Sequence, residues 1–170
     1  VTLEALVRQA GTAGWEQWAC VGTPADDPHP QVAELPRERI SALVFDSDAL
    51  PFPLPGMSDV MPYPSSRFAE LTGGRLARYL QAWRELLGEA MERIQPAVIH
   101  CHHIWLVSSL LAELAPESSK VVAHCHATGL RQRALAPHLR DLADEGNRQH
   151  EAFAVLHGGH GEQLQRDLGV

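Results

Sequence analysis

Apolar and polar positions along the chain switch between two spacings, one typical of helices and one typical of strands. A first helix is predicted from the helical spacing of apolar residues after Thr2, a good N-cap, and it ends at Gly11. Short apolar runs predict strands at Trp15–Val21, Arg39–Phe45, Ala97–His102, Lys120–Cys125 and Phe153–Leu156. Further helices are predicted at Arg75–Ile94, Trp105–Leu114, Leu135–His150 and Glu162–Leu168.

Residues 46–66 form the longest irregular segment. Proline removes backbone donors and cannot lie within a central strand or a helix, and this segment holds five prolines. Long loops in compact domains are usually functional or disordered, and the apolar side chains here argue against a plain linker. Two interpretations stay open: a loop packed on the domain surface, or a loop that faces a substrate.

Strands separated by helices predict parallel strand pairs joined by right-handed crossovers. The expected fold is therefore an α/β domain with an open, doubly wound, mostly parallel sheet. We expect residues 1–170 to form this single domain. Because the chain opens on a helix, we also expect that a first strand and its turn precede this sequence.

Composition narrows the function classes. The 170 residues include 45% hydrophobic and 21% charged residues, which is typical of a globular domain. With 14 basic against 21 acidic residues and a net charge of −7, a nucleic-acid partner is not expected. No apolar run is long enough for a transmembrane segment. Three cysteines on predicted strands are typical of reduced thiols, so we expect a cytoplasmic location, either free or peripheral to the membrane.

Histidines gather after three successive predicted strands, at the edge where ligands bind in open α/β sheets. Those in the last strand positions are best placed to reach a ligand, and these are His102, His103, His126 and His157. His100 and His124 lie inside their strands, so we expect core histidines bonded to backbone carbonyls. Small residues after His126, and the Gly158–Gly159 pair after His157, would let backbone N–H groups approach a ligand. The chain has neither a dinucleotide-binding glycine motif nor a P-loop.

Three segments carry a family resemblance: PAVIHCHHIWLVSSLLAELAP, KVVAHCHATGLRQ and EAFAVLHGGHGEQLQRDLGV. Together they resemble the amino-terminal domain of family-4 retaining glycosyltransferases, which have two facing Rossmann-like domains in the GT-B arrangement. The segment PGMSDVMPYPSSRF also looks like the acceptor-side loop of some members. The resemblance implies that this chain is the acceptor-side half of such an enzyme.

The resemblance also implies residue roles. His126 would lie beside the transferred sugar and is the expected catalytic residue, whereas His102 and His103 would contact the acceptor. Arg148 would meet an acceptor anion. The remaining expected substrate-binding residues are Thr128, Gly129 and His157, which stands where serine is more usual.

Partners and cofactors follow from the same resemblance. The donor would be a nucleotide sugar, used as a substrate, with no metal and no other cofactor. The acceptor would be a small molecule, a glycan or a lipid-linked group. We expect the donor-binding domain outside this sequence, because its pair of glutamates eight positions apart does not occur here. The chain alone is therefore expected to be inactive.

Two other functions stay open. A zinc-dependent hydrolase could use the histidines and cysteines near the strand ends, all of which are zinc-type ligands. The chain lacks the Cys-x2-Cys and His-Glu-x-x-His spacings that usually mark zinc sites. The second alternative is a non-catalytic module that binds sugars or nucleotides on the same fold.

Overall fold

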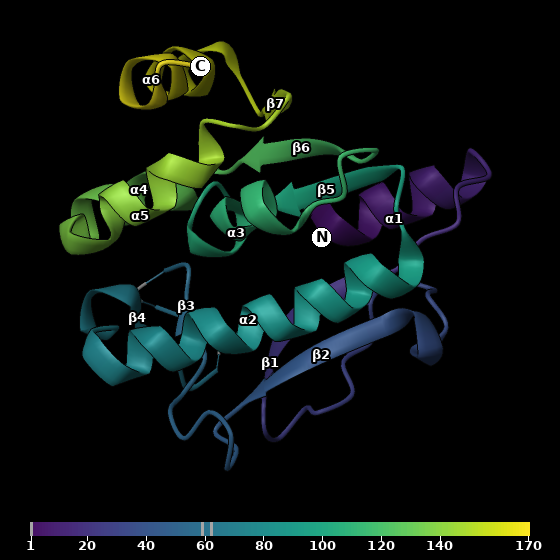
Figure 1. Ribbon diagram of the computed structural model, residues 1–170, viewed down its shortest axis with the longest axis horizontal. Coiled ribbons are helices and arrows are strands. Elements are labelled where there is room, and N and C mark those ends of the chain that lie inside the picture. The colour runs from purple at the N-terminus through teal and green to yellow at the C-terminus, as the bar shows by residue number, and fades with distance from the viewer. Residues whose placement is uncertain (1, 59, 62) are drawn as a thin grey trace. The chain divides into compact units, whose positions relative to one another are not determined.

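The computed structural model describes residues 2–58, 60–61 and 63–170 (Figure 1). Backbone contacts divide the chain into two compact units, one up to Leu54 and one from Pro55 onward. Residues 59 and 62, which belong to the expected acceptor-side loop, lie outside the described residues.

The first unit pairs two parallel strands. Helix α1 (Thr2–Thr12) precedes β1 (Ala19–Pro24), and the short helix η1 (Arg37–Arg39) leads into β2 (Ile40–Phe45). The strands are in register from Ala19 opposite Ile40 to Pro24 opposite Phe45. Phe45 is fully buried and meets Phe52 edge to face, with ring centroids 5.8 Å apart.

The first strand is displaced from its predicted position. Trp15–Val21 was expected as a strand, but pairing begins only at Ala19 and continues to Pro24. The Trp15 N–H donates to the Ala10 carbonyl at 3.0 Å, so the chain is still turning away from α1 there. The Trp15 side chain is 55% exposed, which shows that its apolar character does not mark a paired strand.

The second unit opens with two-residue strands β3 (Pro55–Gly56) and β4 (Ser66–Arg67), which pair in parallel. A short helix, η2 (Phe68–Glu70), follows them. The predicted long helix is confirmed as α2 (Gly73–Ile94), two residues longer at its start. Its buried face follows helical spacing and comprises Tyr79, Leu80, Trp83, Leu87, Ala90 and Met91. It ends where Gln95 adopts a left-handed conformation before Pro96.

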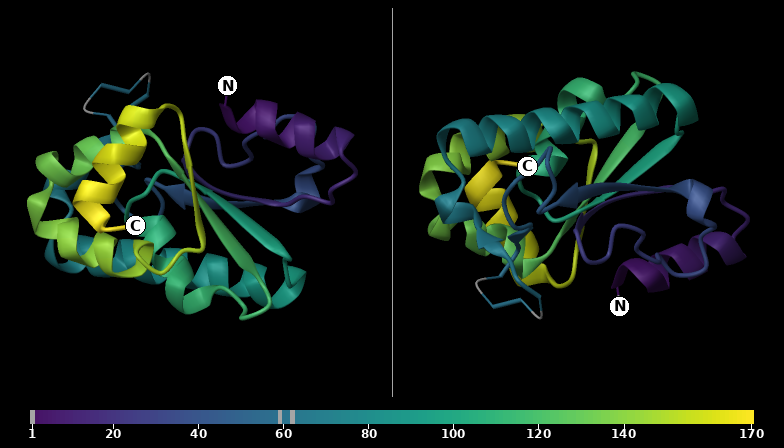
Figure 2. Two further views of the ribbon diagram at one scale, coloured as in Figure 1. Left: turned by 90° about the horizontal axis from the view of Figure 1, so that it is seen from above. Right: turned by 90° about the horizontal axis from the view of Figure 1, so that it is seen from below.

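A three-stranded parallel sheet forms the centre of the second unit. Its strands are β5 (Val98–His102), β6 (Lys120–Cys125) and β7 (Ala152–Val155), in that order. The two views of Figure 2 show β5 and β6 running side by side. Helix α3 (Leu106–Leu114) connects β5 to β6, as the sequence predicts.

Between β6 and β7 the structure differs from the predicted single helix at Leu135–His150. Two helices are present, α4 (Ala127–Leu135) and α5 (Arg140–Asn147), joined by the short helix η3 (Pro137–Leu139). Pro137 cannot continue the hydrogen bonding of α4, so the helix ends before it. The sequence pattern predicts no helix directly after His126, but tertiary packing buries Leu130 and Gln132 and favours one there.

The last helix, α6 (Gly158–Leu168), begins four residues before its predicted start at Glu162. His157 has extended backbone angles at the N-cap, and the helix starts immediately after it. The chain is thus a mixed α/β protein with parallel strands in three small sheets, an architecture consistent with Rossmann-like folds. Within the described ranges, no helix is both long and apolar enough to pass through a membrane.

Helices α3 and α5 cross so closely that the contact admits no side chain at Gly146. A Cβ atom there would overlap the Ser109 carbonyl oxygen. Beside the crossing, a buried hydrogen-bond network joins the helices: the Ser108 hydroxyl donates to Asn147 Oδ1 at 2.7 Å, and Asn147 Nδ2 donates to the Trp105 carbonyl at 2.9 Å. These contacts fix α3, and with it the turn that follows β5.

We predict that Gly146→Ala lowers the free energy of unfolding by about 1–3 kcal/mol, because the added methyl group must displace the backbone of α3. Gly88→Ala is the matched control. Gly88 lies within α2 with open space around it, so alanine should stabilise the helix by about 0.5–1 kcal/mol. Urea denaturation measures the change in the free energy of unfolding for each substitution. Equal changes would contradict the close crossing of α3 and α5 at Gly146.

Candidate functional site

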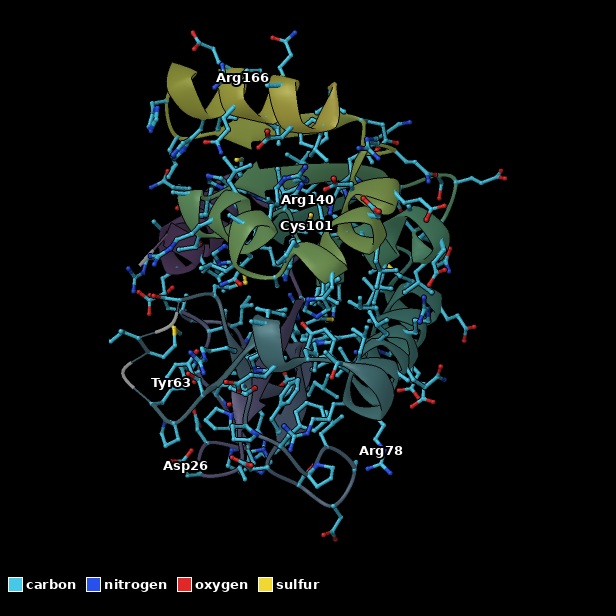
Figure 3. The ribbon with its side chains drawn as sticks, turned by 90° about the vertical axis from the view of Figure 1, so that its left-hand side faces the viewer. Asp26, Tyr63, Arg78, Cys101, Arg140 and Arg166 are labelled. Atoms are coloured by element: carbon cyan, nitrogen blue, oxygen red, sulfur yellow. The ribbon has the colours of Figure 1, made fainter. Side chains whose placement is uncertain are left out.

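Five histidines come together where β5 and β6 end. The parallel register places His102 directly opposite His124, and the alternation of side chains in a strand puts His100 on the same face as His102. His126 follows the end of β6, and His103 follows the end of β5. Figure 3 labels Cys101, the residue of β5 that separates His100 from His102.

The imidazole rings stack on one another across the two strands. His124 stacks with His126 at a centroid distance of 4.4 Å, with His102 at 5.5 Å and with His100 at 5.6 Å. His103 lies against His126 with centroids 4.7 Å apart. We name these five side chains the histidine cluster. They confirm that imidazoles from neighbouring parallel strands gather at a common edge.

Hydrogen bonds set the outer part of the cluster. His102 Nδ1 and His126 Nε2 lie 3.2 Å apart, so one ring donates and the other accepts. Thr128 Oγ1 lies 3.1 Å from His103 Nδ1. The predicted residues are therefore joined in a chain of contacts, from His102 to His126, to His103 and to Thr128.

The turn after β5 adopts a constrained geometry. His103 has a φ of +67°, in the left-handed region that side chains other than glycine rarely adopt, and its N–H donates to the His124 carbonyl at 3.0 Å. Gly129 packs against this turn: an added Cβ would lie 3.1 Å from the Ile104 nitrogen. Gly129 is thus needed for close packing of α4 on the turn, which is a structural reason for glycine beside its predicted role in substrate binding.

The last two histidines form a separate pair. His157 and His160 have ring centroids 3.8 Å apart at the start of α6. Burial, then His124 and His100, lower the pKa of His126, and the charge of His160 adds to this, so His160 lies within electrostatic reach of the cluster. His157 itself is exposed.

Arg148 makes its contacts elsewhere. Its Nε donates to the Leu168 carbonyl at 3.1 Å, and its Nη2 lies 3.6 Å from the Asp144 carboxylate. These interactions join α5 to the end of α6. The structure gives Arg148 no contact with the cluster, and its role toward an acceptor anion stays a prediction.

The expectation for the two histidines inside the strands is partly wrong. His100 is exposed, not a core residue. His124 is buried as expected, with 8% of its surface exposed, but its Nδ1 has no hydrogen-bond partner. The expected bond from this nitrogen to a backbone carbonyl is therefore absent. The two-residue period of side chains in a strand predicts His124 and His126 on one face, and their rings are indeed stacked.

The cysteines lie apart from the histidines. Cys125 is fully buried in a core with Leu130, Leu164 and Leu168, and Cys101 packs against this core. The Cys101 thiol donates to the Val122 carbonyl at 3.7 Å, and burial raises its pKa to about 12. Both thiols therefore belong to the opposite face of the strands and are unsuited to act with the cluster.

His102 and His103 are uncharged near neutral pH. Burial lowers the pKa of His102 to about 4, and the neighbouring histidines, His100 first, add to the effect. Burial likewise lowers the pKa of His103 to about 4, with smaller contributions from His126 and His124. No carboxylate among the described residues offsets either shift. Neutral imidazoles can both donate and accept hydrogen bonds, which suits sugar hydroxyls as well as metal ions.

We predict that this cluster makes the protein sensitive to acid. In the unfolded chain the pKa of histidine is about 6.5, so below that pH the unfolded state takes up protons that folded His102 and His103 refuse. Stability is therefore lost progressively as the pH falls from about 6.5 to about 4. The free energy of unfolding, measured by urea denaturation at a series of pH values, should fall less steeply with pH in the double variant His102→Gln and His103→Gln. An unchanged slope would contradict the lowered pKa values.

Comparison with protein-family models and with curated proteins finds no match to this chain.

Proposed function

We propose that this chain is the acceptor-side half of a retaining glycosyltransferase of the GT-B type, a hexosyltransferase that uses a nucleotide-sugar donor. One observation carries the proposal: His102, His103 and His126, the motif residues that resemble family-4 enzymes, form one contact group where two parallel strands end. Ligands bind at this edge of open parallel sheets. In this proposal the sheet is part of a doubly wound, Rossmann-like domain.

The protonation state of the cluster supports sugar binding. With the pKa of His102 and His103 about 4, both rings are neutral near pH 7. One nitrogen of each ring is hydrogen-bonded to His126 or Thr128, and the second nitrogen is a donor or an acceptor according to the tautomer. The Thr128 hydroxyl adds a further polar group beside His103. Sugar hydroxyls need such mixed donors and acceptors.

The surroundings of the cluster fit transfer better than hydrolysis. Glycosidases use two carboxylic acids on either side of the bond that breaks. The described hydrogen bonds and ring contacts of the cluster involve histidine and threonine, with no acidic side chain. In the proposed reaction, the acceptor oxygen bonds to the anomeric carbon as the bond from that carbon to the diphosphate breaks. The acceptor hydroxyl proton passes to the leaving phosphate, so a carboxylate base on this half is unnecessary.

The loop that resembles the acceptor-side segment is attached to the helix that follows His126. Gln132 of α4, which is almost fully buried, donates through Nε2 to the Met57 carbonyl at 3.1 Å. This bond ties the loop to α4, the helix that begins directly after His126, and in this proposal the loop faces the substrate. The donor would be held by a second domain.

We predict that acceptor sugars, not nucleotides, perturb the cluster. The experiment is an NMR titration of the imidazole resonances with hexoses, hexose phosphates and, separately, nucleoside diphosphates. Shifts at His102, His103 and His126 with sugars, and none at the exposed His29, support the proposal. Shifts with the nucleotide alone would favour a nucleotide-binding module, and an unresponsive cluster would overturn the proposal.

Turnover can be measured in a protein in which this chain is joined to a donor-binding domain. His126→Ala should lower kcat by about 10²–10³-fold, the usual effect of removing one hydrogen bond that stabilises the transition state. His29→Ala, in the first unit, is the matched control and should leave turnover unchanged. Circular dichroism establishes that both variants fold. Unchanged turnover in a folded His126→Ala protein would remove His126 from the reaction.

A further inference from the structure

Three members of the histidine cluster are arranged as metal ligands are. One ring nitrogen from each of His102, His124 and His126 lies within 4.8 Å of the other two. His102 Nδ1 and His126 Nε2 are 3.2 Å apart. Two nitrogens bound about 2.0–2.1 Å from a tetrahedral zinc ion are separated by about 3.3–3.4 Å, so this pair is already at ligand spacing.

His124 supplies an independent observation. Its side chain is more than nine-tenths buried, and Nδ1 has no hydrogen-bond partner among the described atoms. Leaving a buried polar atom unpaired is unfavourable unless another group satisfies it. A bound ion would stabilise this ring, either by coordinating it directly or by fixing its tautomer.

The ligand types determine which ion fits. The group contains imidazoles only, which suit zinc, copper and nickel, whereas magnesium and calcium require oxygen ligands. Cys101 and Cys125 belong to the opposite face of their strands, so thiolates do not complete the site. Three protein ligands leave a fourth coordination position for water or another small ligand.

We infer that His102, His124 and His126 form a three-imidazole binding site for a divalent transition-metal ion such as Zn²⁺. The inference goes beyond the proposed transfer reaction and does not depend on it. If that reaction is correct, an ion bound to His126 would compete with the sugar for this ring, and metal would inhibit transfer. Metal binding itself is measurable without any assay of transfer.

The test is a Zn²⁺ titration of the purified chain, without a histidine tag, in competition with a chromophoric chelator. We expect one Zn²⁺ per chain and at least a tenfold weaker affinity for His102→Ala, His124→Ala and His126→Ala, because each variant loses one ligand. His100→Ala is the matched control: it stacks on His102 and His124 but is outside the ligand group, so its affinity should be unchanged. Binding that is lost in His157→Ala or His160→Ala, and retained in the three ligand variants, would overturn the inference.

A second measurement covers the case in which a buried variant such as His124→Ala fails to fold. X-ray absorption spectroscopy of the Zn²⁺-loaded unsubstituted protein counts imidazole ligands directly. A zinc ion bound by three imidazoles and one further nitrogen or oxygen ligand would support the site. Fewer imidazoles, any thiolate ligand, or less than one bound ion per chain would reject it. Sugar-induced shifts in the NMR titration are read separately in metal-free protein, so failure of one proposal leaves the other testable.

Discussion

The parallel register of β5 and β6 is the constraint on which the site depends. It places His102 opposite His124, and the two-residue period of each strand then brings His100 and His126 to the same face. A shift of one residue in either strand would exchange histidines for cysteines and move thiols into the site. The same register buries Cys125 in the apolar core, so core packing and site geometry reinforce each other.

Crowding of imidazoles has an electrostatic consequence. Burial lowers the pKa of His102 to about 4, and the neighbouring imidazoles, His100 first, add to the effect because each ring disfavours a proton on its neighbours. The unprotonated lone pairs that result are what a sugar hydroxyl or a transition-metal ion requires. Both proposals depend on the same close grouping of imidazoles, whose described hydrogen bonds and ring contacts involve no acidic side chain.

Polar contacts outside the cluster hold its supporting helices in place. Asn147 of α5 bonds to both Ser108 and the Trp105 carbonyl, which fixes the start of α3 behind the β5 turn. On the other side, buried Arg133 pairs with Asp144 and donates to the Asp167 carbonyl at 3.2 Å, which joins α4, α5 and α6. Because these groups are buried, removing one partner would leave an uncompensated charge or dipole.

The sequence by itself determined the elements with strong periodicity: α2, β6 and the gathering of histidines after parallel strands, because local spacing and strand polarity suffice for these. Only the tertiary structure decided that α4 is a helix, because its stability comes from burying Leu130 and Gln132 against distant residues. It alone also decided that Arg148 pairs with Asp144 and Leu168, and that Nδ1 of buried His124 has no partner among the described atoms. Such choices depend on which partners meet across the fold, and a linear pattern does not contain that information.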